Sequence, residues 1–249
     1  MLKAHLAIVG ALALMIASSA SHAGDAYTPD KGTATIKGTV SYDGPEIKRP
    51  TIEIPDAGCA AMHAAAPLKK EQVVVKDGKL ANVIVYVKSG AEKWTFTPPA
   101  DAVVFTQEGC QYKPHVFAVM ADQPINITNG DAFAHNVHGT SPSKANAEFN
   151  VAQSVKGASD VKKLKEAELP FRINCDVHKW MEAYVGVFTH PFFAVSKEDG
   201  TFEIKLPAGD YEIAVWHESG GKKLDEPDAV KVSVKDGEAK TQDFTFKKK

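Results

Sequence analysis

Short stretches in which hydrophobic and polar residues alternate recur along most of the chain. A period of two places successive side chains on opposite faces of a strand, so each stretch indicates a half-buried strand. The stretches lie at 34–42, 73–75, 80–87, 102–106, 115–120, 124–128, 171–173, 184–188, 202–206, 211–215, 230–234 and 244–246. Turn dipeptides such as Asp77-Gly78 and Asp236-Gly237 separate several of them. The pattern predicts an all-β protein of the β-sandwich type without a long amphipathic helix.

Three segments depart from simple alternation. The strand expected at 80–87 has apolar residues on both faces, which predicts a central strand and not an edge. Residues 55–70, which are rich in Ala and Pro, are expected to be irregular. The polar residues 140–168 are expected to form a long surface loop with one short helix at 160–167.

The first residues have the pattern of a secretory signal. A basic Lys3 precedes the apolar run 6–16, and the small residues of Ser21-His22-Ala23 form a cleavage site. The run is shorter than the roughly 20 residues that a membrane helix needs. We expect residues 1–23 to be removed after Ala23, leaving a periplasmic or secreted protein without a membrane span.

Composition limits the binding partners and the cysteine chemistry to be expected. The 29 basic and 31 acidic residues nearly balance and are mixed along the chain, so nothing indicates a nucleic-acid partner. The chain has three cysteines, Cys59, Cys110 and Cys175, and in an oxidising compartment an odd number leaves one unpaired. If a metal holds Cys175, a Cys59–Cys110 disulfide remains, which would contribute about 4 kcal/mol. The alternative is a second metal site formed by Cys59 and Cys110 with His63 and His115.

The segment 175–181 concentrates three kinds of metal donor. It places Cys175, His178 and Met181 at the spacing C-x2-H-x2-M, between two predicted strands. A thiolate, an imidazole and a weak thioether are donors of a mononuclear type 1 copper site. Such a site needs a second histidine. The segment 133–138 offers His135 and His138, and strand alternation allows only one of them to face the metal.

The motif His135-Asn136-Val137 followed by the Cys175 loop resembles the cupredoxins, in particular those of the amicyanin type. The resemblance covers about residues 99–190. It implies a copper domain at 99–191 with one type 1 copper ion. The equatorial ligands that it implies are His135, Cys175 and His178, and Met181 would be the axial ligand.

The residues around the ligands also have expected roles. Asn136 would hydrogen-bond across to the Cys175 loop and order it. Trp180 and Lys179 would contribute to a docking patch, although Trp180 would equally serve as a packing residue. The implied function is transfer of single electrons between redox partners such as a c-type cytochrome or an amine dehydrogenase of methylamine oxidation.

Other interpretations of these residues remain open. Cys175 would be an ordinary buried thiol and His178 a surface histidine if the motif were accidental. Zinc is disfavoured because methionine is a poor zinc ligand. A catalytic subunit of a nitrite reductase-like assembly is disfavoured because no second histidine cluster is evident, so we expect a carrier and not an enzyme.

The chain ends resemble a second family. Asp199-Gly200-Thr201-Phe202, the turn 207–211 and the strand 35–40 resemble the carboxypeptidase regulatory-like (transthyretin-like) β-sandwich. The resemblance implies a discontinuous sandwich of residues 24–98 and 192–249 that encloses the copper domain. It also implies a scaffold or adhesion role, which leaves a non-redox surface-binding, carbohydrate-binding or copper-storage module as the alternative function.

Overall fold

The structure, a computed structural model, describes residues 24–249. The expected signal segment 1–23 lies outside these residues. The all-β class is confirmed, because strands dominate and the helices described are a 3-10 turn at Pro29–Lys31 and α1 at Ala57–Met62. Between residues 24 and 249, no helix has the length and apolar character that crossing a membrane requires.

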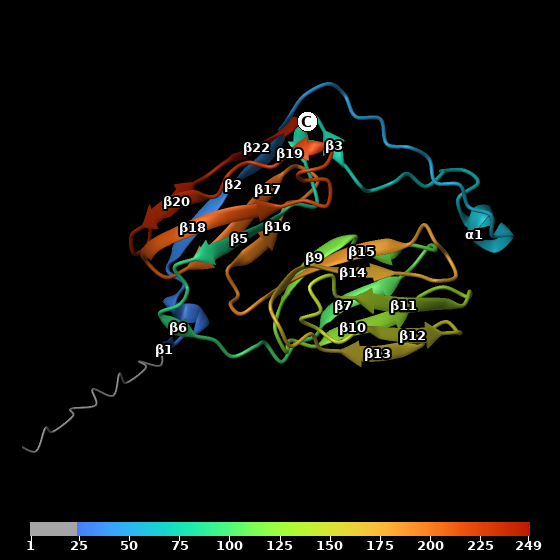
Figure 1. Ribbon diagram of the computed structural model, residues 1–249, viewed down its shortest axis with the longest axis horizontal. Helices are drawn as coiled ribbons and strands as arrows, with labels where there is room; N and C mark the ends of the chain where they lie inside the picture. The colour runs from blue at the N-terminus through green and yellow to red at the C-terminus, as the bar shows by residue number, and fades with distance from the viewer. Residues whose placement is uncertain (1–23) are drawn as a thin grey trace, which may run out of the picture.

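One β-sandwich is built from the two ends of the chain (Figure 1). Its larger sheet contains β2 (Ala34–Asp43), β3 (Val75–Lys76), β4 (Lys79–Leu80), β17 (Thr201–Leu206), β19 (Leu224–Asp225), β21 (Ala239–Thr241) and β22 (Phe244–Lys248). The facing sheet contains β16 (Phe193–Val195), β5 (Ile84–Ser89), β18 (Gly209–Trp216) and β20 (Val230–Val234). Alternate residues of these strands, such as Ile36, Val85 and Phe202, form one buried core. We call this unit the outer sandwich.

The second sandwich is continuous and lies between the two halves of the first in the sequence. One sheet has the order β13 (Ser159–Lys162), β10 (Ile125–Asn129), β7 (Val103–Gln107) and β8 (Tyr112–Lys113). The other has the order β12 (Phe149–Gln153), β11 (His135–Thr140), β14 (Glu168–Asn174), β15 (Glu182–Phe188) and β9 (Val116–Met120). Its separate core includes Phe105, Phe171 and Cys175. We call this unit the inserted sandwich. A short parallel pair, β1 (Asp25–Ala26) and β6 (Trp94–Thr95), precedes it.

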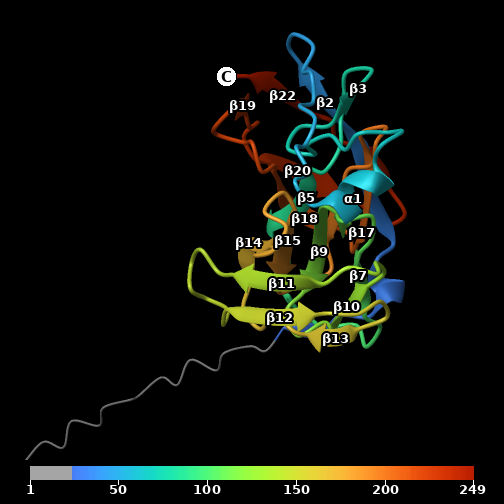
Figure 2. The same cartoon turned by 90° about the vertical axis from the view of Figure 1, so that its right-hand side faces the viewer.

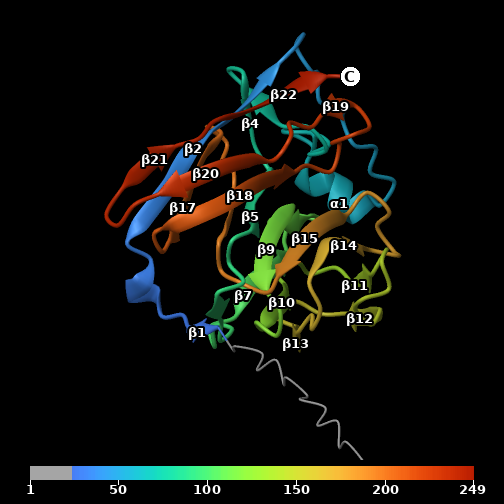
Figure 3. The same cartoon turned by 60° about the vertical axis from the view of Figure 1, so that its left-hand side comes forward.

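The two sandwiches share an apolar interface. Figure 3 shows that β5 of one lies beside β9 of the other. Strand β5 lies between β16 and β18, as its two apolar faces predict. Val85 and Val87 enter the core of the outer sandwich. Ile84 and the partly buried Tyr86 on the other face instead pack in a cluster with Phe188 of the inserted sandwich. The second apolar face of the strand therefore serves as a docking surface between the two units.

A buried ion pair crosses the same interface. His115, just before β9, and Glu218, just after β18, bring Nε2 and Oε1 to 2.5 Å, with side chains 6% and 3% exposed. The other ring nitrogen, Nδ1, donates to the carbonyl of Glu182 at 3.0 Å. Since both ring nitrogens face acceptors, the geometry favours the protonated imidazole. Burial lowers the pKa of His115, but the hydrogen bond and charge of Glu218 raise it by more, so the pKa is raised overall.

The prediction of a helix at 160–167 is wrong. Residues Ser159–Lys162 instead form β13, which pairs antiparallel with β10 in a register that joins Ile127 to Asp160. Residues 149–153 of the expected surface loop form β12, which pairs with β11. Both strands have alternating exposed and partly buried residues, and backbone pairing to a neighbouring strand outweighs the weak local helix preference.

A long excursion, residues 44–74, leaves the outer sandwich after β2 and returns at β3. Its two arms pair with each other at Thr51 and Lys69. Its tip carries α1, which the structure places in a segment expected to be irregular. Figures 1 and 2 show the arms extending from the outer sandwich so that α1 lies over the inserted one. We call residues 44–74 the strap.

Candidate metal centre

The segment 175–181 is a tight loop that connects β14 to β15. Within it, the amide of Cys175 donates to the carbonyl of Met181 at 3.1 Å, and the amide of Met181 donates to the carbonyl of His178 at 2.9 Å. The amide of His178 also points at the Cys175 sulfur, 3.3 Å away. These bonds and the paired strands on either side hold the three candidate ligands in a fixed arrangement.

Three donor atoms converge beneath this loop. Nδ1 of His135, at the start of β11, lies 2.8 Å from Nδ1 of His178. One donor atom from each of His135, Cys175 and His178 lies within 4.8 Å of the others, and all three residues are buried. Met181 is also buried, in the same core cluster as Cys175. Two imidazole nitrogens and a soft sulfur, closed off from water, fit a copper ion.

Asn136 connects the two halves of the site. Its Oδ1 accepts a hydrogen bond from the Cys175 thiol at 3.2 Å and another from the amide of Asp176 at 2.7 Å. Its Nδ2 donates to Asn150 on the neighbouring strand at 2.8 Å. The structure thus places Asn136 in the loop-ordering position that the sequence predicts for it.

His138 faces away from the cluster, as strand alternation requires of one of the two candidate histidines. Its Nδ1 lies 3.0 Å from Oδ2 of Asp176, and its side chain is 30% exposed. It is absent from the groups of potential metal-binding residues that the described part of the chain contains. Of the two candidate histidines, the structure brings only His135 to Cys175 and His178.

Asp131 belongs to the site, and sequence analysis missed it. Its carboxylate accepts from Nε2 of His135 at 3.0 Å and from the amides of Gly109 and Cys110 at 2.8 and 2.7 Å. Because a carboxylate only accepts, the proton of His135 is fixed on Nε2 and Nδ1 is left free for a metal. The only signal in the sequence was an acidic residue four positions before His135.

The pKa shifts differ among the members of the cluster. Burial raises the pKa of the Cys175 thiol, but the neighbouring His135 side chain and backbone amides lower it by more, so the pKa is lowered overall. Burial lowers the pKa of His135, while Cys175 and Asp131 raise it by more. Burial and the nearby His135 lower the pKa of His178. The shifts at Cys175 and His178 are toward the thiolate and the neutral imidazole, the forms that metals bind, whereas the raised pKa of His135 means that a metal there competes with a proton.

Cys59 of α1 and Cys110 form a disulfide between positions 51 apart in the sequence. Cys175 is left as a free, buried thiol. The alternative second metal site is not assembled, because His63 lies against the carbonyl of Gly109 and His115 pairs with Glu218. The odd cysteine is therefore the one beside the two histidines.

Trp180 and Lys179 differ in exposure. The indole of Trp180 is partly buried, lies 5.0 Å from the His178 ring, and donates from Nε1 to the carbonyl of Cys110 at 3.0 Å. The side chain of Lys179 is 77% exposed. Trp180 thus packs beneath the strap tip, and of the two only Lys179 presents an open side chain.

Comparisons with known proteins give partial likenesses. No protein-family model matches the chain, and no curated protein matches it. The chain is similar to a copper-containing nitrite reductase (NirK) from Thermus scotoductus SA-01, at 15% identity and a TM-score of 0.33, over 41% of this chain and 25% of that chain.

It is also similar to a Cu(I) form of an amicyanin variant, at 20% identity and a TM-score of 0.32, over 41% of this chain and 97% of that chain. A reduced form of another amicyanin variant has 21% identity, with the same coverage and TM-score. The chain thus spans 25% of the length of the reductase. The function proposed below rests on the donor atoms of the site.

Proposed function

We propose that this chain is an exported protein that binds one copper ion in a type 1 site and transfers single electrons. The supporting observation is the buried convergence of His135, Cys175 and His178, with the His135 and His178 Nδ1 atoms 2.8 Å apart. Met181 would be the weak axial ligand. When bound, copper supplies a one-electron couple that a thiolate, imidazoles and a thioether together support.

The chain's own residues would hold this ligand set in place. Asp131 fixes the tautomer of His135, Asn136 orders the Cys175 loop, and the strands β14 and β15 keep the loop from relaxing. A rigid, dry site limits reorganisation when the charge of the centre changes. The role that follows is that of a carrier and not an enzyme, with a c-type cytochrome or an amine dehydrogenase as candidate partner classes. The outer sandwich would be a regulatory-like scaffold.

The test is to add one equivalent of Cu(II) to the purified protein and record its visible spectrum, followed by cycles of reduction and reoxidation. We expect an intense thiolate-to-copper band that bleaches on reduction and returns on oxidation. A colourless Cu(II) complex would contradict the type 1 assignment.

A second candidate function has one observation in its favour. His178 is only 5% exposed, so its ring does not meet solution directly. A non-redox module that binds a surface or carbohydrate, or stores copper, has no need of an exposed ligand. Reversible electron exchange between the coloured protein and a soluble c-type cytochrome separates the two, because a storage or structural site would not exchange electrons on mixing.

We predict that Asp131→Asn weakens copper binding by about 10- to 100-fold, the usual effect of losing an outer hydrogen-bond partner of a ligand. The amide cannot accept from Gly109, Cys110 and His135 together, so His135 loses its fixed tautomer. Competition with a Cu(I) chelator measures the change. Asp236→Asn, in an exposed turn of the outer sandwich, is the matched control. If the two variants bind copper with equal affinity, Asp131 does not support the metal site.

A further inference from the structure

The disulfide lies directly against the metal centre. Sγ of Cys59 is 3.8 Å from Nε2 of His178, the ring nitrogen that faces away from His135. The Cys59–Cys110 bridge therefore occupies the edge through which the His178 ring would otherwise meet solution. Together with the Trp180 ring, whose centroid lies 5.0 Å away, this cover leaves His178 5% exposed.

The same bridge reaches the other imidazole. The amide of Cys110 donates to the Asp131 oxygen that also accepts from Nε2 of His135. Gly109 and Cys110 both have positive φ, 68° and 51°, which turns their two amides toward that carboxylate. The outer nitrogens of both histidines are thus linked to the two ends of one disulfide.

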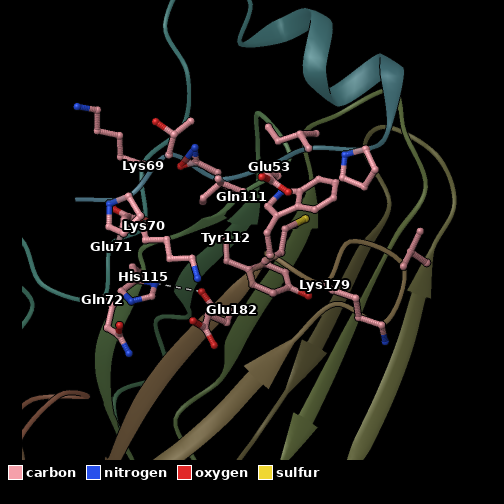
Figure 4. A pocket seen from close by; sticks show the side chains of 18 residues that line it. Glu53, Lys69, Lys70, Glu71, Gln72, Gln111, Tyr112, His115, Lys179 and Glu182 are labelled. Carbon is pink, nitrogen blue, oxygen red and sulfur yellow. Dashed lines mark hydrogen bonds between the residues drawn. The ribbon is translucent and has the colours of Figure 1, made fainter. Parts of the chain in front are cut away.

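The strap that delivers Cys59 is anchored at its roots, where Ile47 and Val73 pack against the outer core, and at its tip by the disulfide. Between its arms and the inserted sandwich lies a cavity of about 840 Å³, lined by strap residues such as Glu53 and Lys70 and by Tyr112 and Met181 (Figure 4). Between root and tip the arms therefore border this cavity. A helix of six residues has little stability of its own.

The tip is seated by close packing as well as by the covalent bond. A Cβ added to Gly58 would lie 2.3 Å from the ring of Phe133, two residues before His135, so α1 packs tightly on that ring. His63 lies 2.8 Å from the carbonyl of Gly109, and Trp180 donates to the carbonyl of Cys110. The disulfide is the covalent one among these contacts. Both of its cysteines are fully buried, so a reductant reaches the S–S bond only when α1 lifts from its seat.

We propose that the strap is a disulfide-locked cap over the metal centre and that reduction of Cys59–Cys110 opens the Nε2 edge of His178 to a partner. The reductant is an external dithiol. It gives up two electrons and two protons and closes to a disulfide, while the S–S bond of the protein breaks into two thiols. The inference rests on the proposed function only in taking His178 as a copper ligand.

The test measures accessibility of the His178 ring on the full-length protein, with and without copper. Diethyl pyrocarbonate modifies imidazole nitrogens, and peptide mass spectrometry gives the rate at each histidine. In the double variant Cys59→Ala/Cys110→Ala we expect the modification rate at His178 to rise by about tenfold or more. A tenfold rise corresponds to a loss of about 1.4 kcal/mol in the free energy that keeps the cap closed. The rate at His138, already 30% exposed, should stay unchanged and reports an intact fold.

A second variant keeps the disulfide and disturbs the seat. Gly58→Val places a side chain against Phe133 and is expected to raise the rate at His178 in the same direction, whereas Ala61→Val on the exposed side of α1 is the matched control. The cap proposal is wrong if the modification rate at His178 is unchanged in the double variant. If the double variant does not fold, an unchanged rate in Gly58→Val decides against the proposal in the same way. A colourless copper complex of the unaltered protein would instead refute the proposed function and leave the accessibility result standing.

Discussion

Replacing Cys175 with serine is expected to abolish the visible band of the copper-loaded protein completely. The band requires a thiolate bonded to copper, and Cys175 is the free cysteine beside His135 and His178. We expect copper affinity to fall by more than about 100-fold, the upper range for residues that merely support a ligand. Visible spectroscopy and chelator competition measure the two effects.

The fold should survive this substitution. A serine hydroxyl can donate to the same Asn136 oxygen that accepts from the thiol, so the metal-free free energy of unfolding should change by only about 1 kcal/mol. Lys179→Ser, on the exposed part of the same loop, should leave the band intact. A band that persists in Cys175→Ser would show that the ligand assignment is wrong, whereas loss of the band in Lys179→Ser would point to damage of the whole loop.

Local sequence pattern was sufficient for the all-β class and for many of the strands. The period of two predicted the all-β class, and the two apolar faces of 80–87 correctly predicted a central strand. The spacing in 175–181 placed Cys175 and His178 together, and the cupredoxin resemblance selected His135 over His138. The inferences from spacing and alternation depend on neighbours in one strand or one loop, whereas the approach of His135 to the distant Cys175 loop was implied only by the resemblance.

Long-range contacts were beyond the sequence. Nothing in the turn that contains Asp131 shows that its carboxylate meets Cys110, because that contact depends on the packing of two separate loops. The odd number of cysteines suggested that Cys59 pairs with Cys110. It gave no indication that this disulfide lies against His178. The helix expected at 160–167 failed for the same reason, since β10 supplies the partner that makes it a strand.

Glu218→Gln is expected to destabilise the protein by about 3 kcal/mol, the cost of removing one partner from a buried ion pair. His115 and Glu218 come from different sandwiches and are almost fully buried, so the loss leaves a charged imidazole without its counter-charge. Urea unfolding near pH 6 measures the change, and Glu203→Gln, on an exposed position of β17, is the control. The double variant His115→Leu/Glu218→Leu should recover much of the stability, because apolar residues can replace a buried pair. Without such recovery, the loss in Glu218→Gln would come from packing and not from charge.

The pH dependence of urea unfolding separates the contributions of His115 and His217 to stability. His115 has a raised pKa in the folded state, so its contribution is complete below the unfolded value of 6.5 and is lost as the pH rises through the folded value. His217 behaves oppositely: burial and the charge of His115 lower its pKa to about 4, so stability falls by about 3 kcal/mol as the pH drops from 6.5 to 4. We therefore expect the gap between Glu218→Gln and the unaltered protein to narrow in alkali, where His115 is neutral in both. A gap that stays constant from pH 6 to pH 10 would mean that Glu218 stabilises the interface through its hydrogen bond and packing, without the charge of His115.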